Sequence, residues 1–180
     1  MTTKTRDGLL RLVYAAVCLA LCMVLPFLTG HIPQVGQFLS PMHIPVLLAG
    51  FLCGPWWALA VGLIAPPMRH FIFHFPPYPT FVAMAFELAV YGLVCGLMYR
   101  ALPKKTPYIY VSLIVAMIAG RIVSGLANVV LYAVGAKEGT YTLSAFLAAH
   151  FITAWPAIAL HIVLIPVLVI ALRRAGVIRD

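Results

Sequence analysis

Long apolar runs separated by short polar segments form the main pattern along the chain. The runs end at prolines, glycines or clusters of basic residues, where a helix seldom continues. Pro66-Pro67 interrupts one run in its middle. The pattern predicts six helices, at about residues 9–28, 41–53, 56–73, 80–102, 108–134 and 143–173.

Composition indicates which solvent surrounds these helices. Hydrophobic residues make up 64% of the 180 residues and charged residues only 9%, whereas soluble domains carry roughly 25% charged residues. A membrane-spanning helix takes roughly 20 apolar residues, so the chain has room for six spans with short loops. We therefore predict an all-α integral membrane protein, a compact bundle of six transmembrane helices over residues 1–180, with no attached ATPase domain.

The basic residues indicate an orientation in the membrane. The net charge is +8, but Lys and Arg lie mainly at the ends of apolar runs, which favours a topology signal over nucleic-acid binding. With six spans, the loops at 29–41, 74–79 and 135–142 fall on one side of the membrane. Lys137 is the one Lys or Arg in these loops. Both termini are therefore predicted to be cytoplasmic, and the first run is predicted to be a retained helix. The clusters on the cytoplasmic side are Lys4, Arg6 and Arg11; Arg100, Lys104 and Lys105; and Arg173, Arg174 and Arg179.

Four ionisable residues inside the apolar runs are candidates for function, because such groups are costly within a membrane. They are Arg69, Glu87, Arg121 and His150, one on each of four predicted helices. From the helical rise, each lies roughly 10 Å below the predicted outer face. Four helices thus bring polar groups to nearly the same level, which predicts one outward-facing pocket.

Neighbouring residues extend this predicted pocket at helical spacing. One polar stripe contains Arg121, Ser124, Asn128 and Tyr132, and a second contains Met84, Glu87 and Tyr91. The proline pair just before Arg69 also suits a cavity wall, because broken membrane helices are tolerated there.

Charge favours an anionic ligand for this pocket. An Arg–Glu pair would leave one arginine over, and arginine binds a carboxylate through two parallel hydrogen bonds. Three alternatives remain open from the residues alone. Arg69 could snorkel to the outer interface, Glu87 and Arg121 could form a purely structural pair, and His150 could be a packing residue.

Small residues form a second pattern, because their spacing lets helix backbones approach closely. The pairs are Ala16 and Ala20, Gly50 and Gly54, and Gly92 and Gly96. They indicate either internal packing or contact with another membrane subunit. Cys18, Cys22, Cys53 and Cys95 all lie in apolar runs without a CxxC motif, so we interpret them as packing residues.

The chain resembles the S components of energy-coupling factor (ECF) transporters, which are six-helix vitamin-binding subunits. The resemblance rests on the segment 39–55, which begins Leu-Ser-Pro-Met-His-Ile-Pro, on the proline-rich loop 74–79, and on Met84-Ala-Phe-Glu-Leu-Ala-Val-Tyr-Gly92. The pair Ala16 and Ala20 is similar to the motif with which that family docks on its membrane partner.

The resemblance implies a multi-pass protein of a prokaryotic plasma membrane that binds a vitamin from outside. It then docks on a membrane scaffold subunit with two cytoplasmic ATPases and topples to release the ligand inward, while loops 29–41, 74–79 and 135–142 close the pocket. The pantothenate and riboflavin branch is the most similar, and pantothenate carries the required carboxylate. Riboflavin, a pyridoxine-type vitamin and a queuosine precursor remain open. No cofactor is expected, and no metal, since the start Met1-Thr-Thr-Lys lacks the metal ligands of nickel and cobalt subunits.

Two other classes of protein compete with this interpretation. A stand-alone secondary transporter could use Glu87 as a proton carrier. An intramembrane serine protease could use Ser124 and His150, but the residues flanking Ser124 do not fit a Gly-x-Ser-x-Gly pattern. We therefore predict a protein without enzymatic activity.

Overall fold

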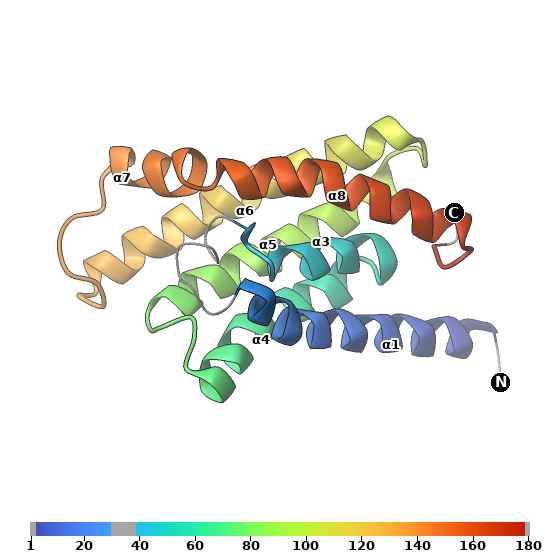
Figure 1. Cartoon of the computed structure of the whole chain (residues 1–180), viewed down its shortest axis with the longest axis horizontal. Coiled ribbons are helices and arrows are strands. Elements are labelled where there is room, and N and C mark those ends of the chain that lie inside the picture. The colour runs from blue at the N-terminus through green and yellow to red at the C-terminus, as the bar shows by residue number, and fades with distance from the viewer. Residues whose placement is uncertain (1–2, 30–38, 179–180) are drawn as a thin grey trace.

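The computed structural model of the chain describes residues 3–29 and 39–178, and its regular elements there are all helical (Figure 1). Three of the elements have only five residues each: the 3-10 helix η1, the α-helix α7 and the π-helix η2. In chain order, the elements are α1 Thr3–Val24, η1 Leu25–Thr29, α3 His43–Leu52, α4 Pro55–Phe73, α5 Thr80–Ala101, α6 Thr106–Ala133, α7 Leu143–Leu147, η2 Ala148–Ile152 and α8 Trp155–Arg174.

Four helices in the described part of the chain are long and apolar enough to cross a membrane. They comprise residues Thr5–Phe27, Thr80–Ala101, Thr106–Ala133 and Trp155–Arg174. The helix α3 is too short, and α4 carries the proline pair and Arg69-His70, which lower its hydropathy. An all-helical membrane protein is thus confirmed, whereas the number of six spans and the cytoplasmic termini remain predictions.

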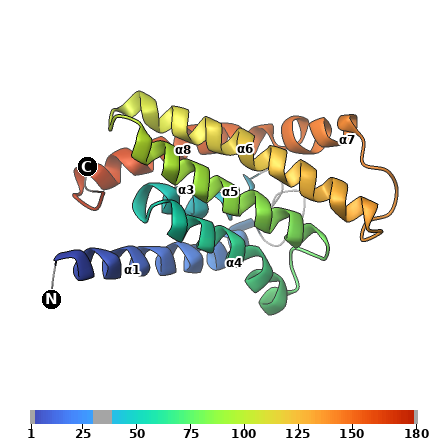
Figure 2. The ribbon, with the colours of Figure 1, turned by 180° about the vertical axis from the view of Figure 1, so that it is seen from behind.

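The short helix α3 lies in the middle of the bundle, between α1, α4, α5 and α8 (Figure 2). Eight of its ten residues are buried, which is expected for a helix that is apolar on every side. Ten residues extend only about 15 Å, roughly half the hydrocarbon thickness of a bilayer. The helix therefore fills the core at one end and leaves space beyond its first residue, His43.

Both glycine pairs serve internal packing. A methyl group on Gly50 would lie 3.0 Å from Cys95 Cβ, and one on Gly96 would lie 2.6 Å from the backbone nitrogen of Pro55. Since α3, α4 and α5 approach each other through these glycines, a larger side chain there would force the helices apart. Ala16 and Ala20 differ, because both are exposed on α1. All four cysteines are free and buried, as expected of packing residues.

The prediction of one continuous helix over residues 143–173 is wrong. The chain forms α7, then the π-helix η2, then a turn at residues 153–154, and α8 begins at Trp155. Pro156 accounts for the break, because it has no N–H to donate to the carbonyl four residues earlier, at Ile152, and its ring clashes with that carbonyl in a continuous helix. The first helix also differs from expectation, since α1 begins at Thr3 and becomes a 3-10 helix at Leu25.

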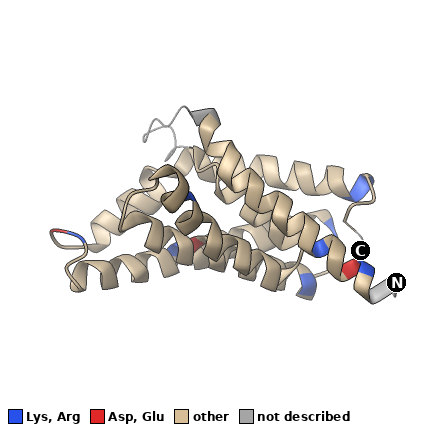
Figure 3. Ribbon diagram, turned by 90° about the horizontal axis from the view of Figure 1, so that it is seen from below, with Lys and Arg blue, Asp and Glu red and all other residues tan. Residues whose placement is uncertain are grey.

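Both termini lie at one end of the bundle, and the loops after α4 and α6 lie at the other (Figure 1). Most lysines and arginines gather at the end with the termini (Figure 3). The predicted loop 29–41 falls largely on residues 30–38, which lie outside the described residues, so its closure over the pocket is not tested.

Candidate functional site

A cavity of about 700 Å³ occupies the end of the bundle opposite the termini. Its volume falls within the ~300–1,000 Å³ typical of sites for small molecules. The first turns of α5, the second half of α6 and the residues just before α3 form its walls, and η2 lines one side. The structure brings together seven of the eight predicted pocket residues here: Arg69, Met84, Glu87, Arg121, Ser124, Asn128 and His150.

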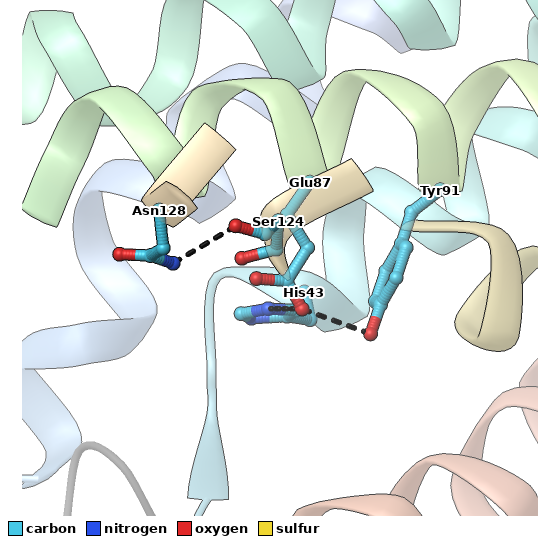
Figure 4. Close-up of polar contacts among 5 residues, drawn as sticks. All are labelled: His43, Glu87, Tyr91, Ser124 and Asn128. Atoms are coloured by element: carbon cyan, nitrogen blue, oxygen red, sulfur yellow. Dashed lines mark hydrogen bonds and ion pairs between the residues drawn. The ribbon is translucent and has the colours of Figure 1, made fainter. Parts of the chain in front are cut away.

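A buried polar cluster forms the floor of the cavity (Figure 4). Glu87 Oε1 lies 3.8 Å from His43 Nε2 and accepts a 3.1 Å hydrogen bond from the Tyr91 hydroxyl. Tyr91, the eighth predicted residue, does not line the cavity but supports it from behind through this bond. A buried carboxylate is stable only with such partners, so the cluster fixes the position of Glu87.

The expected Arg–Glu pair is wrong. The ion-pair partner of Glu87 is His43, and neither Arg69 nor Arg121 lies within ion-pair distance of Glu87 in the described structure. The sequence interpretation missed His43, although the criterion that selected the other four residues also applies to it. It is an ionisable residue in an apolar run, placed at the start of the buried helix α3. Its ring also stacks on that of His161, with centroids 5.9 Å apart.

Arg69 is buried, with 1% of its surface exposed, so the snorkelling alternative is wrong. Its Nη1 donates a 2.5 Å hydrogen bond to the carbonyl of Met23. Its guanidinium lies 5.1 and 5.2 Å from the ring centroids of Phe27 and Phe73. Nε and Nη2 are buried and have no hydrogen-bond partner among the described residues. Two donors therefore remain at the cavity wall, and such groups are costly unless something accepts from them.

The polar stripe on α6 continues into the loop that follows it. Asn128 Nδ2 donates to the Ser124 carbonyl at 2.9 Å (Figure 4), and Lys137 Nζ donates to Asn128 Oδ1 at 2.6 Å. One turn before Ser124, the Arg121 guanidinium lies 5.5 Å from the ring centroid of Phe151. Burial lowers the pKa of the Lys137 ammonium. Lys137 was predicted only as a loop residue, and the structure adds it to the cavity lining.

Aromatic rings line the side of the cavity near this loop. Tyr132 and Tyr141 stack with centroids 5.3 Å apart and an interplanar angle of 20°. His150 lies on the π-helix η2, and its ring contacts that of Phe146 at 4.9 Å. His150 therefore packs against a neighbour and lines the cavity at once. The sequence analysis did not predict Tyr141 as a cavity residue. Its position beside Tyr132 depends on the conformation of the loop after α6, which residue spacing does not give.

Cationic side chains outnumber carboxylates around the cavity. Among the described residues, its lining contains Arg69, Arg121 and Lys137 but only one carboxylate, Glu87. In a low-dielectric setting this excess favours an anion. No group of three or more His, Cys, Asp or Glu among residues 3–29 and 39–178 could hold a metal ion.

A cavity lined by apolar side chains and three cations, inside a bundle of apolar helices, is the arrangement expected of a membrane protein that binds a small molecule. Residues 10–170 match the family model described as ECF transporter, substrate-specific component, and the chain belongs to this family. It is therefore a transporter subunit rather than an enzyme. Comparisons with curated proteins and with solved structures gave no significant match.

Proposed function

We propose that this chain binds pantothenate at the outer membrane face and delivers it through an ECF module. The cation excess around the cavity supports this ligand best. Glu87 already has His43 and Tyr91 as partners, so it does not neutralise the arginines. The cavity therefore suits a molecule that brings its own carboxylate.

The polarity of the lining supports one orientation of the ligand. The carboxylate lies beside Arg121 and Lys137, where α6 and its following loop place two cations near Asn128. The hydroxyl groups of pantothenate lie toward Glu87 and His43, which offer a buried acceptor and a ring nitrogen. The two methyl groups pack against the apolar side chains of the wall, Ala83, Met84 and Ala149.

One observation favours a second candidate. Tyr132 and Tyr141 stack nearly parallel at the cavity wall, and such rings also stack on flat heterocycles. This arrangement suits riboflavin or a queuosine precursor better than pantothenate, which has no ring. A pyridoxine-type vitamin is flat but lacks a carboxylate for the arginines.

The energy for transport comes, in this proposal, from a membrane scaffold subunit and two ATPases. Ala16 and Ala20 are exposed on the outer side of α1, where a neighbouring helix could approach closely. A stand-alone proton-coupled transporter would instead move its substrate without these partners. Uptake into cells with and without the scaffold and ATPase subunits therefore separates the two mechanisms.

Native mass spectrometry of the purified protein identifies a co-purified small molecule, and titration calorimetry then compares ligands. We expect pantothenate to bind, and pantothenol, which has an alcohol in place of the carboxylate, to bind at least about thirtyfold more weakly. Equal affinity for the two compounds would show that the arginines do not hold a carboxylate. Binding of riboflavin without pantothenate would support the second candidate.

A further inference from the structure

A second cavity, which we call the basal cavity, lies at the end of the bundle that carries the termini. Its volume is about 260 Å³, which is room for several water molecules or one small polar group. The first half of α1, the turn between α3 and α4, the end of α5 and residues 176–178 form its walls. Figure 3 shows that most lysines and arginines gather at this end.

Three cationic side chains and one carboxylate from the described part of the chain line the basal cavity. The cations are Arg11, Arg100 and Lys104, and the carboxylate is Asp7. They come from three parts of the chain: the start of α1, the last turn of α5 and the loop after it. Both arginines are exposed, so their positive charge is open to an anion that enters the cavity.

Two of the three cations have no partner in the described part of the chain. Neither Arg11 nor Arg100 forms a hydrogen bond or an ion pair with a residue of ranges 3–29 and 39–178. The neighbouring Arg173 behaves differently, because it donates to the Tyr99 hydroxyl at 2.7 and 2.9 Å and to the Lys104 carbonyl at 3.0 Å. Arg173 thus has a structural role, whereas Arg11 and Arg100 retain free donors.

The backbone leaves room for Arg100 at the cavity wall. Gly54 has a φ of +90°, and a methyl group there would lie 2.5 Å from Arg100 Nη2. The guanidinium therefore lies directly over the turn between α3 and α4. The last carbonyls of α3 face the same region and attract a cation. Lys104 is placed by its hydrogen bond to the Tyr99 carbonyl and by its contact with the Tyr99 ring. Arg11 and Arg100 are therefore the two cations that an anion would meet.

We propose that the basal cavity binds a phosphate group, as carried by an anionic phospholipid headgroup. Guanidinium groups bind phosphate oxygens through charge-assisted hydrogen bonds, and Arg11 on α1 and Arg100 on α5 provide two such groups. A lipid headgroup is the expected source, because the basic end of a membrane protein lies at the surface of a leaflet rich in anionic lipid. Free phosphate is the other source of the same chemistry.

The test measures lipid retention by native mass spectrometry, with the full chain in detergent containing phosphatidylglycerol or phosphatidylcholine. We expect the wild-type protein to retain phosphatidylglycerol preferentially. The Arg11→Gln variant should weaken that retention about fivefold, as expected for one basic group near a membrane surface. Arg6→Gln is the matched control, since it removes the same charge from the same helix at an exposed position outside the cavity.

Added inorganic phosphate distinguishes the two sources. If phosphate at millimolar concentration displaces the lipid from the wild-type protein but not from Arg11→Gln, the site binds the phosphate group itself. If phosphate does not compete, the site needs the whole lipid. The proposal is overturned if wild type shows no preference for phosphatidylglycerol, or if Arg6→Gln and Arg11→Gln weaken retention equally. The Arg100→Gln variant repeats the test with the arginine on α5.

Discussion

At the scale of single residues, the charged side chains around the cavity differ in the partners that they contact. Glu87 is held by His43 and Tyr91, and Arg69 by one carbonyl and two aromatic rings. Arg121 instead lines the cavity beside a ring, on the same helix face as Asn128. Glu87 is therefore fixed by its partners, whereas Arg69 keeps two nitrogens at the cavity wall that have no hydrogen-bond partner among the described residues; in the proposed function, Arg121 is the cation that contacts the ligand.

Replacement of Arg121 by alanine tests this assignment. We expect Arg121→Ala to weaken pantothenate binding at least about thirtyfold, because truncating one partner of a buried charge pair costs about 2 kcal/mol or more. Titration calorimetry measures the effect, and a thermal melt in detergent shows that the variant is folded. Arg174→Ala removes the same charge from an exposed position at the other end of the bundle. Unchanged affinity in Arg121→Ala would mean that this arginine is structural.

Glu87 distinguishes a binding role from proton transport. The Glu87→Gln variant retains an acceptor for the Tyr91 hydroxyl but removes the charge that faces His43. If Glu87 only organises the cavity floor, we expect energised uptake to persist with affinity reduced by about tenfold or less, the size of one neutral hydrogen-bond change. Uptake by wild type under a proton gradient alone, lost in Glu87→Gln, would instead support the secondary transporter.

At the scale of helices, short and broken elements create the cavity. The helix α3 begins only at His43. The π-helix η2 takes the place of a regular α-helix at His150, which lines the cavity. The close contacts between α3, α4 and α5 hold the opposite end of the bundle together. The cavity therefore exists because α3 is short, and the other helices do not have to separate to make room for it.

Those close contacts make a prediction about stability. In Gly92→Ala, the new methyl group would meet the backbone of Ala58 on the facing helix. Such overpacking typically costs about 1–3 kcal/mol, so we expect a lower melting temperature in detergent. Gly8→Ala is the matched control, because its methyl group meets nothing within 4 Å and alanine is the better helix former. A melting temperature of Gly92→Ala equal to wild type would contradict the packing of α4 against α5.

The sequence predicted the helices well where one apolar run forms one helix. Seven of the eight predicted residues line the cavity, because depth along a helix follows from counting residues; their contact with a ligand stays a prediction. The sequence interpretation failed at Pro156, where one apolar run contains three helical elements. It also failed for His43, Lys137 and Tyr141, which reach the cavity through a short central helix and a loop. Side-chain partners such as His43 and Glu87 depend on tertiary packing, which residue spacing does not encode.

At the scale of the whole molecule, the proposals assign separate roles to the two ends of the bundle and to the α1 face. The ligand cavity lies at one end, the basal cavity at the other, and the exposed Ala16 and Ala20 lie between them on α1. The inner face of α1 is different, because Ala15, Cys18 and Cys22 are buried against the core. Ligand binding and docking can therefore be disturbed independently.

This separation gives the last prediction. In Ala16→Leu, a larger side chain on the outer face of α1 blocks the close approach of a partner helix without entering the core or the ligand cavity. We expect pantothenate affinity to be unchanged and uptake by cells that co-express the scaffold and ATPase subunits to be lost. Ala171→Leu, at an exposed alanine of α8, should affect neither property. Normal uptake by Ala16→Leu would show that the partner docks elsewhere, and weaker ligand binding would show that α1 supports the cavity directly.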